Sequence, residues 1–373
     1  MTDRYQQFAT SGLGRKIVKQ LGLPAPVPLR RRRPGKPDLA GTVLVGAAEG
    51  GRLDKAVTDV LAGADVEVRS EPAEERHRAL IFDATGVKHS TQLRAVYEFF
   101  HPVIRRVDTC GRVIVLGTPP EDADDPREAA AQRGLEGFVK SVGKEAGRGV
   151  TANLVYVAPG AENGIGSTLR FLASHRSAYV SGQPVRITPA EIPDSDPERP
   201  LEGQTALVTG AARGIGAVIA EVLAGYGAEV VCLDIPAAGG DLARVANQIG
   251  GSALQLDITG ADAPRIIAQH LTSRHDGLDI MVHNAGITRD KTLGRMSEQQ
   301  WESVIDVNLA SQERIDDVLL GEDVLNDGGR IVSVSSISGI AGNAGQTNYA
   351  TSKAAVAGRV VSLAPAMRER NGT

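Results

Sequence analysis

A short apolar run followed by three spaced glycines constrains the fold of this chain more than any other feature. Residues 206–208 are typical of a buried strand, and Gly210, Gly214 and Gly216 follow before a run with helical apolar spacing. Glycines let a backbone approach a pyrophosphate closely, and the free N–H groups at a helix start stabilise its charge. The pattern therefore predicts a dinucleotide-binding loop, although such a turn between strand and helix can also be purely structural.

The composition limits the classes of protein that remain. The chain has 373 residues, enough for two domains, and a net charge of −4 that provides no general attraction for nucleic acid. Cys110 and Cys232 each lie beside apolar, strand-like sequence, which predicts buried free thiols and no metal site. No apolar run approaches membrane-spanning length, and the N-terminus lacks the core of a signal peptide. We therefore expect a cytoplasmic protein without a membrane or nucleic-acid partner.

The chain divides into four parts. Residues 1–40 form an arm with a short helix at 12–21 and a basic run at 30–33, which we interpret as solvated or as a salt-bridge donor. Strand and helix patterns alternate over 41–188, four prolines mark a linker at 189–203, and the alternation resumes over 204–373. This alternation predicts the α/β class, with two doubly wound parallel sheets in tandem. The expected strands are 42–46, 78–83, 111–117, 150–157 and 183–187, then 206–209, 229–234, 253–257, 279–283 and 330–335, and the expected helices of the first unit are 53–61, 92–104 and 128–146.

The two halves also resemble each other. The run Gly-Arg-Val-Ile-Val-Leu from Gly111 matches Gly-Arg-Ile-Val-Ser-Val from Gly329. A duplicated Rossmann-like unit explains this match. In the first copy Arg52 stands where the last loop glycine is expected, and Glu49 brings a negative charge near a would-be phosphate. We expect no dinucleotide in that copy.

Polar residues follow three strands of the second unit. Asp234 ends the expected strand 229–234, where a carboxylate accepts both ribose hydroxyls of NAD and repels the 2′-phosphate of NADP, although an ordinary turn residue also fits. Asp257 is expected to lie near the adenine, and residues 284–286 follow the fourth strand at the edge where ligands of such folds bind. These positions and the loop together favour a nicotinamide dinucleotide, with NAD(H) preferred over NADP(H).

Ser336, Tyr349 and Lys353 are the candidates for chemistry. Tyr349 and Lys353 are four residues apart, so they share one face of a helix. An ammonium beside a phenol favours the phenolate, which makes the phenol a usable proton donor and acceptor near neutral pH. A single Tyr-x-x-x-Lys pattern is common by chance, so the assignment of a catalytic role depends on the neighbouring motifs.

With these motifs in place, the second half resembles the short-chain dehydrogenases/reductases, most of all their 3-oxoacyl-thioester (β-ketoacyl) reductases. The run 209–216 resembles the family's cofactor loop, 283–290 its Asn-Asn-Ala-Gly segment, and Asn308 its helix asparagine. Ser336, Tyr349 and Lys353 match its catalytic residues. The whole chain, with a degenerate first unit, resembles the long, high-molecular-weight bacterial form.

The resemblance implies an oxidoreductase of fatty-acid metabolism that reduces 3-oxoacyl thioesters, carried on CoA or on acyl carrier protein, as a homodimer or homotetramer. In it Tyr349 protonates the ketone oxygen, Lys353 holds the ribose, Ser336 binds the substrate oxygen, and Asn308 holds a water that links Lys353 to solvent. The implied cofactor-binding residues are Gly210, Arg213, Gly214, Ile215, Gly216, Asp234, Asp257, Ile258, Asn284, Ala285, Gly286, Tyr349 and Lys353. In the first copy Thr118 and Glu128 fall opposite Ser336 and Tyr349, so we expect that copy to be inert.

The sequence departs from this pattern at two places. His283 replaces the family's usual first asparagine, and the first copy continues as far as Ile187, well beyond the point that matches Thr373. We therefore expect the second sheet to lack its last two strands, together with the substrate lid. A reductase of another ketone or alcohol, and a truncated pseudoenzyme acting as a binding or assembly module, remain as alternatives. The acidic stretch 321–329 favours CoA thioesters at least as much as carrier-bound ones, with Arg289, Lys291 and Arg295 as partial compensation.

Overall fold

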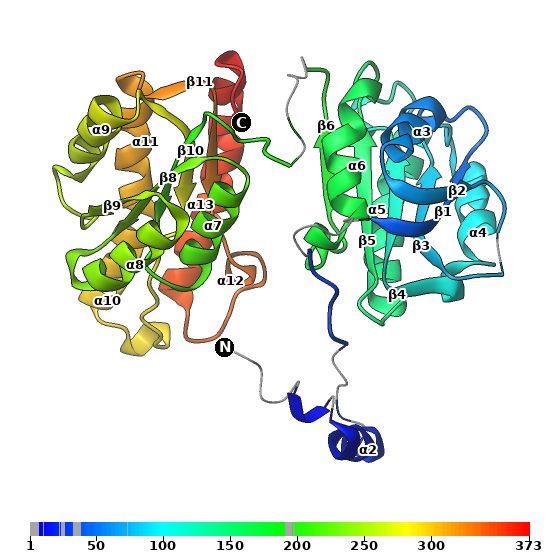
Figure 1. Cartoon of the computed structure of the whole chain (residues 1–373), viewed down its shortest axis with the longest axis horizontal. Helices are drawn as coiled ribbons and strands as arrows, with labels where there is room; N and C mark the ends of the chain where they lie inside the picture. The colour runs from blue at the N-terminus through cyan, green and yellow to red at the C-terminus, as the bar shows by residue number, and fades with distance from the viewer. Residues whose placement is uncertain are drawn as a thin grey trace. The chain divides into compact units, whose positions relative to one another are not determined.

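The computed structural model describes residues 7–9, 11–21, 23, 27–32, 39–72, 74–190, 196 and 198–373 (Figure 1). It consists of two compact units, 1–193 and 194–373, which are described separately. The predicted linker at 189–203 lies partly outside the described residues, as do the arm residues Arg33, Pro24 and Pro26. The arm helix α2 (Gly12–Gln20) is one residue shorter than expected.

The described part of the first unit holds a six-stranded parallel sheet with helices on both faces. The strand order is β2-β1-β3-β4-β5-β6, the flavodoxin-like order extended by one strand. The strands are β1 (Ala40–Ala47), β2 (Asp65–Arg69), β3 (His77–Asp83), β4 (Val107–Gly117), β5 (Thr151–Val157) and β6 (Pro184–Ile187). One apolar core joins the sheet to α3 (Asp54–Ala62) and α6 (Ile165–Ala173), and the other joins it to α4 (Arg94–Phe100) and α5 (Pro126–Glu145). The predicted doubly wound sheet is confirmed.

The second unit holds a five-stranded parallel sheet within the residues described. Its order is β11-β10-β7-β8-β9, so the direction of winding reverses between β7 and β10. The strands are β7 (Thr205–Thr209), β8 (Glu229–Asp234), β9 (Ser252–Gln255), β10 (Leu278–His283) and β11 (Leu325–Ser333). The helices are α7 (Gly214–Gly225), α8 (Gly239–Ile249), α9 (Ala263–Arg274), α10 (Glu298–Ile305), α11 (Ser311–Gly321), α12 (Ile337–Ala341) and α13 (Thr347–Glu369). In such folds ligands bind at the carboxyl ends of the strands beside the reversal point, here the ends of β7 and β10.

The structure supports the internal repeat with a shared irregularity. Strands β2-β1-β3-β4 occupy the same order as β8-β7-β10-β11. Both β4 and β11 carry a bulge, between Val107 and Arg112 in the first unit and between Leu325 and Arg330 in the second. Each bulge ends at the arginine that follows the first glycine of the repeated sequence run. We infer that the two sheets derive from one ancestral unit.

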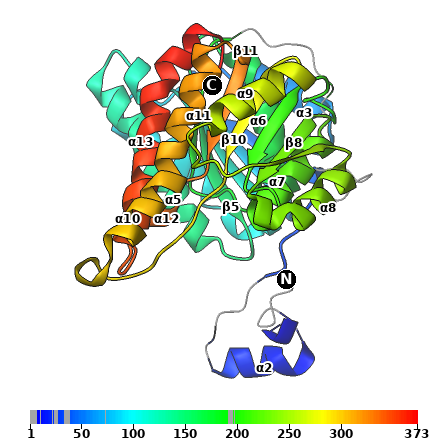
Figure 2. The same ribbon diagram turned by 90° about the vertical axis from the view of Figure 1, so that its left-hand side faces the viewer.

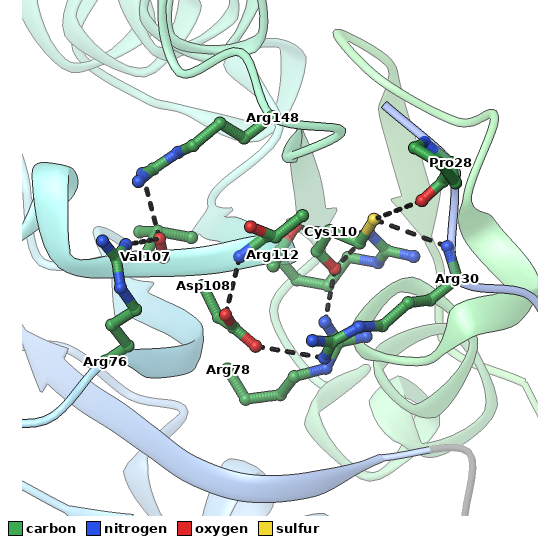
Figure 3. Close-up of polar contacts among 11 residues, drawn as sticks. Pro28, Arg30, Arg76, Arg78, Val107, Asp108, Cys110, Arg112 and Arg148 are labelled. Carbon is green, nitrogen blue, oxygen red and sulfur yellow. Dashed lines mark hydrogen bonds and ion pairs between the residues drawn. The ribbon is translucent and has the colours of Figure 1, made fainter. Parts of the chain in front are cut away.

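The arm is attached to the first unit at this bulge (Figure 3). Cys110 has a left-handed backbone (φ 58°), and its thiol donates to the carbonyl of Pro28 and accepts from the amide of Arg30. The guanidinium of Arg30 forms an ion pair with Asp108 at 3.1 Å. The buried Arg112 donates to the Cys110 carbonyl at 3.0 Å, and burial lowers its pKa to about 10. The basic run thus provides a salt-bridge donor, one of its two predicted roles.

Candidate functional site

The glycine loop lies where β7 ends and is held by the side chain of Asn284. A Cβ on Gly216 would lie 2.2 Å from the carbonyl oxygen of Gly210, so only glycine allows this approach. Gly210 and Gly214 have φ of +69° and +61°, which L side chains rarely adopt. The side-chain amide of Asn284 donates to the carbonyls of Thr209 (2.9 Å) and Gly210 (3.2 Å). The loop is therefore a preformed cradle beside the amino end of α7, and it fits a pyrophosphate.

The two predicted carboxylates lie beside this cradle in different settings. Asp234, the last residue of β8, accepts a hydrogen bond from the amide of Ala212 in the loop at 3.0 Å. Asp257 was expected at the end of a strand, but β9 ends at Gln255 and Asp257 lies in the following turn, where it accepts from Thr259. Asp234 therefore adjoins the loop directly. Three other predicted cofactor residues flank these groups: Arg213 and Ile215 are exposed, and Ile258 is buried.

The predicted catalytic pair lies on α13, and a short helix crosses it. The ammonium of Lys353 is 5.8 Å from the ring centroid of Tyr349 and donates to the carbonyl of Val334 at 2.7 Å. Lys353 is 3% exposed, and this burial lowers its pKa. Ser336 caps α12, which packs on α13 so closely that a Cβ on Gly339 would lie 2.7 Å from the amide of Ala354. Ser336 therefore lies after the end of β11, at the start of a helix that packs on the helix of Tyr349.

Asn308 joins these pieces to the segment after β10. It lies in a π-helical segment, Asp306–Ala310, between α10 and α11. Its side-chain amide accepts from the Ile287 N–H (2.8 Å) and donates to the Ile287 carbonyl (3.0 Å) and to Ser352 (3.1 Å). A Cβ on Gly286 would lie 3.3 Å from Asn308 Oδ1 and 3.5 Å from Lys353 Nζ. Both amide hydrogens of Asn308 are therefore engaged by the protein, and its water-holding role remains a prediction.

Acids of the stretch 321–329 lie away from the predicted site, and the choice between CoA and carrier-bound thioesters stays a prediction. Asp323 and Asp327 lie at the start of β11, whereas Ser336 follows its end, so these acids are at the opposite edge of the sheet from the site. Arg370 pairs with Asp323 at 3.0 Å. The three basic residues weighed against this stretch come after β10, at the site's edge, and are exposed: Arg289, Lys291 and Arg295. Asp290 and Glu298 in the same segment are also exposed, so residues 289–298 carry three basic and two acidic side chains.

The corresponding loop of the first unit is closed by its own side chains. The guanidinium of Arg52 contacts the carboxylate of Glu162 and the carbonyl of Val157 at the end of β5. The carboxylate of Asp83 accepts from the amide of Leu53 at 2.7 Å. These contacts fill the loop of the first unit with its own side chains. Within the described residues, no group of His, Cys, Asp and Glu side chains suits a metal ion, and no helix there is long and apolar enough to span a bilayer.

A buried polar network that no motif predicts lies behind the site. His283 Nε2 lies 2.7 Å from Asp316 Oδ1, and Arg359 donates to Asp316 Oδ2 at 3.1 Å. His283 is visible in the sequence as a departure from the family's asparagine, but its partners, Asp316 and Arg359, come 33 and 76 residues later in the chain. No spacing rule connects residues on a strand and two separate helices.

Known proteins match the second unit. The family model for short chain dehydrogenase matches residues 204–371. The 3-oxoacyl-[acyl-carrier-protein] reductase of Vibrio cholerae is 40% identical over 173 residues, 46% of this chain and 71% of the relative. That of Escherichia coli K12 is 37% identical over 175 residues, with the same two shares. The crystal structure of a putative short chain dehydrogenase from Escherichia coli CFT073 is 30% identical, with a TM-score of 0.44, and covers 46% of this chain and 79% of its own. The chain belongs to the short-chain dehydrogenase family, and it is an oxidoreductase that uses a nicotinamide cofactor.

Proposed function

We propose that the second unit reduces the ketone of 3-oxoacyl thioesters with NADH. The observation that carries the proposal is the convergence of Lys353, Asn308 and Gly286 beside the loop of Gly210 and Gly216. A glycine loop and a tyrosine–lysine pair at one edge of one sheet support a reductase that binds a dinucleotide. The names of the relatives supply the substrate class.

A reduced nicotinamide, when bound, supplies the hydride that the ketone carbon receives. The chain's own residues then have separate tasks. Tyr349 donates its phenolic proton to the ketone oxygen, and Ser336 donates a hydrogen bond to that same oxygen. The ammonium of Lys353, 5.8 Å from the Tyr349 ring centroid, stabilises the phenolate that remains. Asn308 holds the Ile287 backbone against α13 through Ser352.

The preference for NADH rests on Asp234. Its carboxylate accepts from the Ala212 amide, so its position beside the loop is fixed. A carboxylate there accepts hydrogen bonds from ribose hydroxyls and repels a 2′-phosphate. The position of Asp234 beside the loop supports NADH over NADPH.

The exposed segment 289–298, with three basic and two acidic side chains, has a small excess of positive charge for an anionic substrate carrier. Arg289, Lys291 and Arg295 are exposed beside the site. Exposed charges of one sign raise the association rate of an oppositely charged partner, and salt screens the effect. Both acetoacetyl-CoA and acetoacetyl-carrier protein are therefore proposed substrates, and because the phosphates of CoA are also anionic, both should associate faster at low salt.

The test is oxidation of NADH by the full chain, followed by absorbance with each of the two thioesters at low and at moderate salt. We expect turnover with both, and rates at low substrate concentration that fall as salt rises. Binding of NADH without oxidation by either thioester would contradict the proposal and favour a binding module. Rates that do not change with salt would contradict a role for Arg289, Lys291 and Arg295 in attracting the substrate.

A further inference from the structure

A buried carboxylate, Asp316 on α11, joins the two elements that carry most of the proposed site. Its Oδ1 lies 2.7 Å from His283 Nε2, and its Oδ2 accepts from Arg359 Nη2 at 3.1 Å. The side chains of His283 and Asp316 are 1% and 2% exposed. His283 ends β10 and immediately precedes Asn284, whereas Arg359 lies on α13, beyond Tyr349 and Lys353. Figures 1 and 2 both show α11 beside α13.

Asp316 is the last of three buried polar residues spaced four apart. The other two are Asn308 and Gln312, and this spacing places all three on one helix face. Gln312 donates to the Asn308 carbonyl at 2.8 Å and accepts from Ser333 Oγ on β11 at 3.1 Å. The face is therefore hydrogen-bonded to β10, β11 and α13. Asn308, Gln312 and Asp316 form a column of buried polar side chains along this helical segment.

The burial of Asp316 makes the geometry of this column stiff. A buried carboxylate depends on its hydrogen-bond partners, and removal of Arg359 takes away the cation that faces Asp316. A shift of α13 away from β10 stretches one of the two contacts of Asp316. The two contacts of the Asp316 carboxylate consequently oppose a change in the distance between α13 and β10.

We propose that Asp316, His283 and Arg359 form a positioning set that holds Tyr349 and Lys353 in register with the cofactor loop. The proposal rests on the proposed function, because it assigns the set to the geometry of that same site. Arg359 is six residues beyond Lys353, about 9 Å along the helix axis. The set therefore acts through the helix and not on the reacting atoms.

Two variants and one control separate positioning from general stability. Asp316→Asn keeps the size of the side chain and its acceptor for His283, but it removes the charge that faces Arg359. Arg359→Lys keeps that charge. The control is Arg314→Met, which breaks an ion pair of 2.8 Å between Arg314 and Asp306, within the α10–α11 helical segment.

Hydrogen–deuterium exchange of the full chain, without substrate, measures how often the backbone amides of α13 and of the segment after β10 open. We expect Asp316→Asn to speed exchange at 349–359 and 284–287 by roughly tenfold or more over the control, because the tie between them is lost. We expect Arg359→Lys to stay within about threefold of the wild type. Exchange in both segments equal to that of Arg314→Met overturns the proposal.

Kinetics supply the second readout. For Asp316→Asn we expect kcat for NADH oxidation to fall roughly 10- to 100-fold, as for small displacements of reacting groups, while KM and the NADH Kd change less than about threefold. We expect Arg359→Lys, which keeps the positive charge, to retain most of the wild-type kcat. A kcat equal to that of the control overturns the proposal. If the wild-type chain oxidises no NADH with either thioester, the proposed function fails, and exchange alone decides the positioning proposal.

Discussion

Replacing Gly216 by alanine tests the cofactor loop at its tightest point. The added Cβ lies 2.2 Å from the Gly210 carbonyl oxygen and 2.5 Å from Asn284 Nδ2, where real contacts begin near 3.0 Å. The first neighbour is backbone, so it cannot rotate away, and loop and helix must separate by about 0.8 Å. Overpacking of this kind costs about 1–3 kcal/mol, so we expect the NADH Kd to rise between about 5-fold and about 150-fold.

The matched control is Gly225→Ala at the other end of the same helix. A Cβ there meets nothing within 4 Å, so we expect unchanged NADH affinity and a gain of roughly 0.5–1 kcal/mol in stability. Energy transfer from Trp301, the only tryptophan, to NADH measures Kd, and urea unfolding measures stability. A folded Gly216→Ala protein with wild-type Kd would refute the assignment of this loop to the cofactor.

Four further predictions concern separate features of the chain. Asp234→Ala should narrow the preference for NADH in kcat/KM, and a wild type that prefers NADPH would contradict the role of this carboxylate. Tyr349→Phe should lower turnover by roughly two to four orders of magnitude while NADH binding survives; near-normal turnover would mean that another group protonates the ketone. Burial, and then Arg106, lowers the pKa of His77, so the unfolded chain takes up the proton first and stability falls as pH drops below about 6.5; His77→Leu should flatten that slope in urea unfolding between about pH 7 and 5, and an unchanged slope would contradict the assignment. Because Arg52 closes the loop of the first unit, calorimetry should find one NADH bound per chain. Two bound NADH molecules would contradict the expectation that the first unit binds no dinucleotide.

The local sequence pattern predicted that these elements exist, and local chemistry explains where each one begins or ends. The strand at 229–234 matches β8 at both ends, because a buried apolar run there has a charged residue at each end. The helix expected at 128–146 begins at Pro126, after Asp125 caps it through the amide of Arg127. The helix expected at 92–104 ends at Phe100, because Pro102 cannot continue it.

Features that depend on distant partners could not be predicted in this way. Strand β2, Asp65–Arg69, is a half-exposed edge strand with only two apolar residues, and it was missed. Strand β11 begins at Leu325, five residues before the expected start, because a turn-like Asn-Asp-Gly-Gly run forms the bulge. The π-helical segment at Asn308 has no sequence signature. The site residues were predicted from motifs, whereas the column that supports them appears only in three dimensions.

Transfer of deuterium from NADH tests the central claim most directly. The full chain is incubated with acetoacetyl-CoA and NADH that carries deuterium on the transferable C4 position, and the product is analysed by mass spectrometry. We predict 3-hydroxybutyryl-CoA with one deuterium on C3, formed at a rate that Tyr349→Phe lowers by roughly 100-fold or more. A product without deuterium, or no product from a chain that binds NADH, would contradict this claim.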